Sequence, residues 1–137
     1  MRGQVALPFI LLVSGIIIEI TIAGSFITYF LSTSGLGERL SLRASTAAQS
    51  GLRDAMIRVA RDKDYGASTQ NYNLTVGSDT AAVTVSRTVD GTLGIYIYTI
   101  VSTGTASSRQ RKLTATLIVN QKNGYLQLQS LIDTPVT

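Results

Sequence analysis

An apolar run from Val5 to Leu31 constrains this chain more than any other feature. It is 27 residues long and, as a helix, would extend roughly 40 Å at about 1.5 Å per residue. That exceeds the ~20 residues that cross a bilayer, whereas the apolar part of a cleavable secretory signal is shorter. No Ala-x-Ala cleavage site follows the run. We therefore expect a retained membrane helix, and Arg2 in front of it favours a cytoplasmic N-terminus with the rest translocated.

Four residues within this run are more than a plain lipid anchor needs. Pro8 lies in the first turn, where its missing N–H costs little. Gly15 and Gly24, with serines and threonines nearby, let helices approach closely or let a stretch unwind. Glu19 is an acid near the middle of the span, where an ionised carboxylate costs several kcal/mol. It is either a neutral acid without a role or, as we prefer, an acid that meets a partner when helices bundle.

The composition argues against catalysis and metal binding. The chain has no cysteine and no histidine. This excludes a disulfide framework, Ser-His-Asp and Cys-His catalytic groups, and most transition-metal sites. After Tyr65 the acids are Asp79, Asp90 and Asp133, in turns or the tail, with no spacing suited to calcium or acid–base chemistry. We expect no enzyme, no metal and no cofactor.

The basic residues are scattered, although the formal net charge is +4. They cluster at Arg109-Gln110-Arg111-Lys112, which has no flanking aromatic residue on which a base could stack. A small basic patch by itself gives weak, salt-sensitive binding. The pattern favours a solvated loop over a contact with nucleic acid or another anionic surface.

A helical pattern resumes after the apolar run. Ser32 to Gly37 predicts a kink or break between two helical halves. Asp62 onward ends the second half, with Gly66 suited to the left-handed position after a helix. Between them, apolar residues recur at three- and four-residue steps and predict a face that covers a sheet: Leu40, Ala44, Ala47, Gly51, Leu52, Ala55 and Val59.

After Gly66 the apolar period changes to two, which is typical of strands. The expected strands are Asn71–Val76, Ala81–Val89, Leu93–Val101, Lys112–Asn120 and Tyr125–Leu131. The expected turns are Gly77-Ser78-Asp79, Asp90-Gly91, Ser102 to Ser108, and Asn123-Gly124. The predicted fold class is α+β, with a long N-terminal helix, half hydrophobic and half amphipathic, packed on an antiparallel meander of four or five strands.

Tyr96 and Tyr98 are expected on one face of a strand, as an exposed adhesive stripe or, by preference, as a half-buried edge of the core.

Three segments of the chain resemble type IV pilins and pseudopilins. The start, Arg2-Gly3-Gln4-Val5-Ala6-Leu7-Pro8, with the apolar run behind it, resembles a type III signal of that superfamily. Ala47 to Ala55, within Gly37 to Tyr65, looks like the helix continuation of minor pilins of the PilX kind. Ile100 to Thr105 and Arg111 to Leu117 resemble the strand, turn and strand that close the pilin sheet.

The resemblance implies processing and assembly. A prepilin peptidase would cut between Gly3 and Gln4 on the cytoplasmic side, and the new amine would be methylated. The subunit would sit in membrane lipid, then join copies of itself or other pilins, through an inner-membrane assembly platform, in a helical extracellular or periplasmic filament. Pro8 would be the fifth mature residue, where most major pilins carry a glutamate, which favours a minor pilin or pseudopilin.

The predicted organisation is a leader over residues 1–3, a transmembrane and filament-core helix over 4–35, and a globular pilin domain over 36–137. Within the domain, an amphipathic helix over 36–65 precedes a β-sheet over 70–132. The predicted function is a structural subunit of a pilus or pseudopilus. The alternative is a single-pass anchored, exported binding domain that does not polymerise. The small residues and Glu19 favour the filament, because an idle anchor needs neither.

Overall fold

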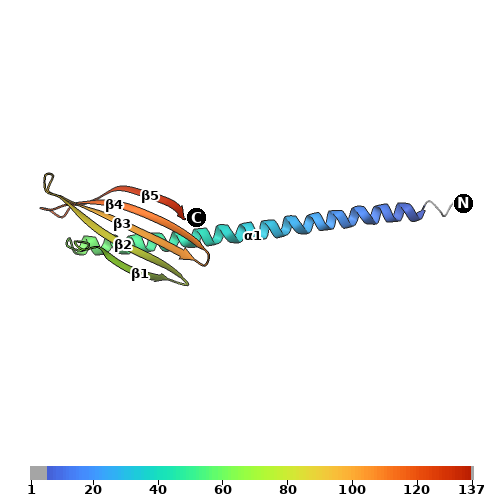
Figure 1. The fold of residues 1–137 in the computed structure, drawn as a ribbon, viewed down its shortest axis with the longest axis horizontal. Coiled ribbons are helices and arrows are strands. Elements are labelled where there is room, and N and C mark those ends of the chain that lie inside the picture. Colours follow the sequence, from blue (N-terminus) through green and yellow to red (C-terminus); the bar gives the residue numbers. More distant parts are fainter. Residues whose placement is uncertain (1–5, 137) are drawn as a thin grey trace. The chain divides into compact units, whose positions relative to one another are not determined.

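The computed structural model describes residues 6–136 and divides the chain into two compact units, Met1–Gly37 and Glu38–Thr137. One helix, α1 (Ala6–Arg61, 56 residues), belongs to both units (Figure 1). Of the kink or break expected at Ser32 to Gly37, a break is absent, because the helical hydrogen bonding continues through this stretch. Helix-compatible residues on both sides outweigh the weak propensity of two glycines in that stretch.

α1 ends where the sequence predicts. Arg58 and Arg61 occupy its last turn, where positive charge interacts favourably with the helix dipole. Gly66 follows with a φ of 88°, in the left-handed region that favours glycine. The segment between Arg61 and Gln70, which includes Gly66, carries the chain from the helix into the first strand.

The second unit holds a five-stranded antiparallel sheet in the order β1-β2-β3-β4-β5, each strand paired with the next (Figure 1). The predicted α+β fold class is confirmed. The strands are β1 (Gln70–Val76), β2 (Asp79–Asp90), β3 (Ile95–Ala106), β4 (Arg109–Asn120) and β5 (Leu126–Val136).

β5 extends to Val136, four residues beyond residue 132, where the sequence predicted the end of the sheet. A register shift opposite Thr116/Leu117 inserts one extra residue into β5. After the shift, pairing with β4 continues to Val136 opposite Gln110. Pro135 is tolerated because β5 is an edge strand, which has no further neighbour to receive its hydrogen bonds.

The amphipathic half of α1 covers one face of this sheet. The predicted stripe is confirmed: Ala44, Ala47, Gly51, Leu52, Ala55 and Val59 are buried, and Leu40 is half-buried. From the sheet, alternate residues of the three central strands complete the core, among them Val83, Val85, Tyr98, Ile100, Leu113 and Leu117. Side chains one residue out of step lie on the opposite face, as the period of two requires.

The turn predicted over Ser102 to Ser108 is wrong, because β3 continues to Ala106 and the turn is only Ser107-Ser108. Small residues here serve the packing of the helix on the strand. A Cβ added to Gly104 would lie 2.0 Å from the carbonyl oxygen of Ala44. Ser102 Oγ donates a hydrogen bond to the carbonyl of Ala48 (2.8 Å) within the core.

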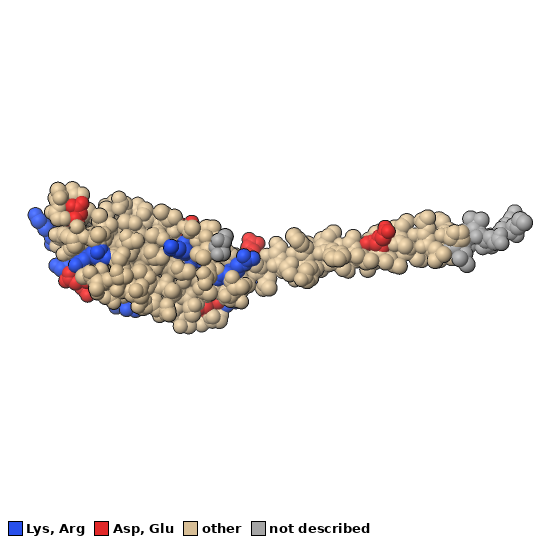
Figure 2. Space-filling view, viewed as in Figure 1, with Lys and Arg blue, Asp and Glu red and all other residues tan. Residues whose placement is uncertain are grey.

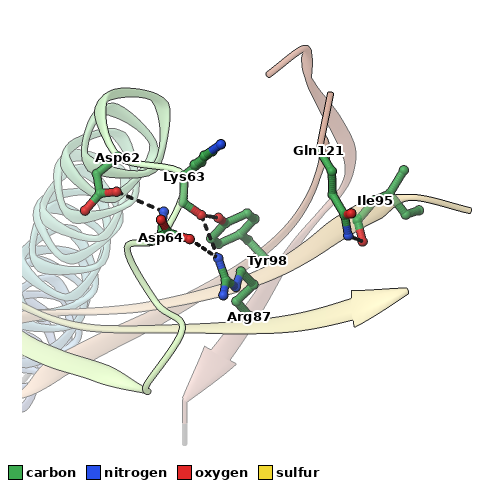
Figure 3. Close-up of polar contacts among 7 residues, drawn as sticks. All are labelled: Asp62, Lys63, Asp64, Arg87, Ile95, Tyr98 and Gln121. Atoms are coloured by element: carbon green, nitrogen blue, oxygen red, sulfur yellow. Dashed lines mark hydrogen bonds and ion pairs between the residues drawn. The ribbon is translucent and has the colours of Figure 1, made fainter. Parts of the chain in front are cut away.

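A polar cluster lies at the end of the sheet domain where α1 ends, between the turn after the helix and strands β2 and β3 (Figure 3). Arg87 donates hydrogen bonds to the carbonyl of Lys63 (2.8 Å) and to Asp64 Oδ1 (3.0 Å), and its guanidinium lies 4.3 Å from the ring centroid of Tyr96. The hydroxyl of Tyr98 also donates to the Lys63 carbonyl. These contacts tie the turn after α1 to β2 and β3.

Tyr96 and Tyr98 of β3 lie at the edge of the core, which is the preferred one of the two alternatives that the sequence left open. Tyr98 is buried, Tyr96 is half-buried, and their rings meet edge to face at 6.4 Å. The alternative of an exposed adhesive stripe is therefore wrong. Cross-strand neighbours and the turn after α1 cover both side chains.

We predict that Gly104→Ala lowers the free energy of unfolding by about 2–3 kcal/mol, because its methyl group would collide with the backbone of α1. Chemical denaturation of the full chain in detergent measures the loss. Gly91→Ala is the matched control, since a Cβ there meets no atom within 4 Å. Equal stability of the two variants would contradict the close helix–strand contact.

Burial raises the pKa of Tyr98 and of Tyr72, and Asp54 adds to the rise at Tyr72. Unfolded tyrosine loses its proton near pH ~10, whereas these folded phenols keep theirs, so stability should fall as pH rises above ~10. Tyr98→Phe should make that fall shallower in denaturation curves recorded across alkaline pH. Tyr125→Phe, at a 67 % exposed position, should leave the slope unchanged.

Candidate functional site

The apolar half of α1 exposes nearly all of its large side chains. Within the first unit their exposed fractions range from 37 % at Val13 to 73 % at Phe30. In the part of the chain that the structure describes, α1 is the helix long and apolar enough to cross a membrane. Such a surface is stable only against lipid or against other apolar helices. The segment can therefore anchor the chain in a membrane.

One face of this segment is built from small hydroxyl residues. At about 100° of rotation per residue, Ser14, Thr21, Ser25, Thr28 and Ser32 fall within an arc of about 60°. We call these five residues the hydroxyl stripe. Gly24 lies about 40° from Thr28, at the border of the stripe. Small side chains along one face allow the backbone of a second helix to come close.

Most hydroxyls of the stripe already have an acceptor in their own helix. Ser14, Thr21, Ser25 and Thr28 each donate to the carbonyl four residues earlier, at 2.7–2.9 Å. Their donors therefore do not oppose insertion into lipid, where an unpaired polar group is costly. Between the side chains lies an open hollow lined by Thr21, Gly24, Ser25, Thr28, Tyr29 and Ser32. A face with small side chains whose hydroxyls are already hydrogen-bonded is suited to packing against another helix.

Glu19 lies on the other side of the helix. It is about 160° from Thr21 and about 180° from Thr28 around the axis. In Figure 2 the apolar segment is tan except for one red side chain, and Glu19 is the acid of that segment. No lysine or arginine occurs between residues 6 and 37. A cation that neutralises Glu19 within this segment must therefore come from outside it.

The predicted assembly residues thus divide between two faces. Pro8 and Gly15 lie about 20° and 40° from Glu19 around the axis, whereas Gly24 lies about 140° away, beside the hydroxyl stripe. No described atom lies within 4 Å of a Cβ added to either glycine, so no contact with the described residues requires a glycine there. These four residues, predicted to act together in assembly, therefore do not share one face of the helix. The seven-residue spacing of Ser14, Thr21 and Thr28 is the signal that separates the two faces.

The predicted processing residues, Gly3 and Gln4, lie outside the described residues. Among residues 6–136, no group of three or more Asp, Glu, Cys or His side chains is placed to hold a metal ion.

Comparison with protein-family models, with curated proteins and with solved structures found no match to this chain.

Thr28→Leu should weaken self-association of the full chain in bilayers by roughly five-fold, because the larger leucine side chain fills the face on which a second helix would pack. Energy transfer between donor- and acceptor-labelled copies in vesicles measures the association. Ile27→Leu is the control, since it keeps the bulk of a neighbouring position outside the stripe. Unchanged energy transfer in Thr28→Leu would remove the hydroxyl stripe as a packing face.

Proposed function

We propose that this protein is a structural subunit of a type IV pilus or pseudopilus filament, polymerised by bundling of its apolar helices. The observation that carries the proposal is the apolar half of α1, whose large side chains are exposed among the residues that the structure describes. The hydroxyl stripe suits close packing, and Glu19 on the other side lacks a cation in its own segment. A helix that serves only as a lipid anchor requires neither feature.

Assembly would transfer the helix from one apolar environment to another. In the bilayer the segment is covered by lipid, and in a filament by neighbouring helices, so its large side chains avoid water in both states. The difference between the two states then arises from packing at the hydroxyl stripe and from pairing of Glu19 with a basic group of a neighbour. Force from a partner machine would extract the subunit from the membrane.

The resemblance of Arg2-Gly3-Gln4 and the following run to a pilin leader supports the same proposal. A prepilin peptidase would cut after Gly3 and leave Gln4 as the mature N-terminus, which would then be methylated. Pro8 in the fifth mature position favours a minor pilin or pseudopilin. Before assembly the subunit would reside in the cytoplasmic membrane, with its sheet domain on the far side.

Intact mass and N-terminal sequence of the protein in sheared cell-surface material test this function. We expect a chain that begins at Gln4 and is heavier by about one methyl group. A chain that begins at Met1 and occurs only in the membrane fraction would instead support an anchored binding domain. Surface filaments containing Met1 would retain the structural role and refute the cleavage site.

The same material tests Glu19. Glu19→Gln should lower the yield of subunit in the sheared fraction while leaving its amount in the membrane unchanged, because glutamine cannot form an ion pair with a neighbour. Glu38→Gln is the control, since Glu38 lies at the start of the second unit and outside the apolar run. Equal yields from Glu19→Gln and the unmodified chain would exclude a role for this acid in assembly.

A further inference from the structure

A group of basic residues surrounds the end of the sheet domain at which the chain enters from Gly37. We call Arg39, Arg43, Arg109, Arg111 and Lys112 the basic collar. α1 contributes two of them, and the start of β4, after the β3–β4 turn, contributes the other three. Arg111 Nε donates to Ser41 Oγ (3.1 Å), which places the β3–β4 hairpin beside the first turns of the second unit. Arg43 reaches Ser78 Oγ (2.5 Å) and Asp79 Oδ1 (2.7 Å), which places the β1–β2 turn beside the same helical turns.

Two of these cations have acidic partners and three do not. Arg43 pairs with Asp79 at 2.7 Å, and Arg111 lies 3.8 Å from Asp133. Arg39, Arg109 and Lys112 are exposed and form no ion pair with a described residue. Glu38 is the neighbouring acid that remains. The domain therefore presents excess positive charge at the end where the apolar segment is attached.

The surroundings of the collar favour a lipid surface over a nucleic acid. No aromatic residue occurs in the segments that form this end of the domain, residues 36–48, 74–83, 101–115 and 132–136, so no ring is available to stack a base. Leu42, 62 % exposed, adds an apolar side chain next in sequence to Arg43. Basic residues with an apolar neighbour suit the boundary between headgroups and acyl chains.

The covalent chain supplies the second argument. Ser41, which Arg111 contacts, is ten residues after Leu31, where the apolar run ends, or roughly 15 Å along a helix at about 1.5 Å per residue. A domain attached this closely to a membrane helix keeps that end near the bilayer whatever its orientation. Fixed positive charges within a Debye length of anionic lipid are attracted to it, and each is worth roughly five-fold in the docked population.

We propose that the basic collar binds anionic lipid headgroups and holds the sheet domain against the membrane before assembly. This inference rests on membrane insertion of the apolar segment, which belongs to the proposed function. The contact would be released when the subunit leaves the bilayer, because the cations then lose the lipid surface. The Arg109-to-Lys112 cluster, otherwise a solvated hairpin, acquires a role in the membrane-bound state.

A single fluorescent label can report the contact, because the chain has no cysteine of its own. Ser108→Cys places the label in the β3–β4 turn beside the collar, and Thr92→Cys places a control label in the β2–β3 turn at the other end of the strands. The full chain is inserted into vesicles of phosphatidylcholine alone or with phosphatidylglycerol, both carrying a headgroup-attached quencher. We expect phosphatidylglycerol to increase quenching at Ser108→Cys, to leave Thr92→Cys unchanged, and to act less in high salt.

Matched variants assign the effect to the collar. Arg109→Gln with Lys112→Gln should lower the docked-to-undocked ratio roughly five-fold for each residue replaced. Lys63→Gln with Lys122→Gln removes the same charge from exposed positions away from the collar and should change it little. An equal effect of the two pairs would overturn the proposal, because net charge alone would then explain binding.

Three further outcomes separate the two proposals. Failure of the chain to float with phosphatidylcholine vesicles would refute membrane insertion and the proposed function with it. Flotation with quenching at Ser108→Cys that ignores phosphatidylglycerol would overturn the collar and leave the filament proposal intact. If the collar variant instead loses affinity for a single-stranded oligonucleotide while quenching ignores phosphatidylglycerol, the patch is a nucleic-acid site and the lipid proposal is wrong.

Discussion

The sheet domain depends on the close approach of α1 to β3, where the helix lies almost directly on the strand backbone. Gly104 makes room for Ala44 and Ala48, and a Cβ on Gly51 would come within 2.5 Å of Ser102 Oγ. This contact restricts the register of the helix on the strand, because a residue with a Cβ in place of Gly104 would collide with the backbone of α1. The hydrogen bond from Ser102 to Ala48 fixes the same alignment in the core.

Both ends of the domain follow from that alignment. At the end of α1, Arg87 and Tyr98 bind the carbonyl of Lys63 and so hold the turn after the helix against β2 and β3 (Figure 3). At the other end, Arg43 and Arg111 tie the first turns of the second unit to two hairpins. These two arginines pair with acids, whereas the remaining cations of the collar are exposed and have no ion pair with a described residue. The exposed cations are available to an anionic surface.

The apolar half of α1 follows a different rule, because its large side chains are exposed within the described part of the chain. The polar side chains of this segment fall into two kinds. The hydroxyls of Thr21 and Ser25 donate hydrogen bonds to carbonyls of their own helix, whereas Glu19 has no lysine or arginine in its segment. Hydroxyls that are already hydrogen-bonded permit insertion of the helix into lipid. An acid without a cation nearby would be stabilised if the helix moved from lipid to a neighbouring subunit that supplies one. The proposed filament uses both properties on opposite faces of one helix.

The sequence by itself determined the apolar anchor, the stripe from Leu40 to Val59 and the five strands, because each depends on a local period of side chains. It also marked Glu19 and Gly24, and their spacing at about 100° per residue assigns them to different sides of a helix. Only the tertiary structure decided that Ser102 to Ala106 is strand, since glycine and serine favour a turn locally and are required here by a helix far away in sequence. The basic collar likewise joins residues from α1 and β4, and no local pattern records such a contact.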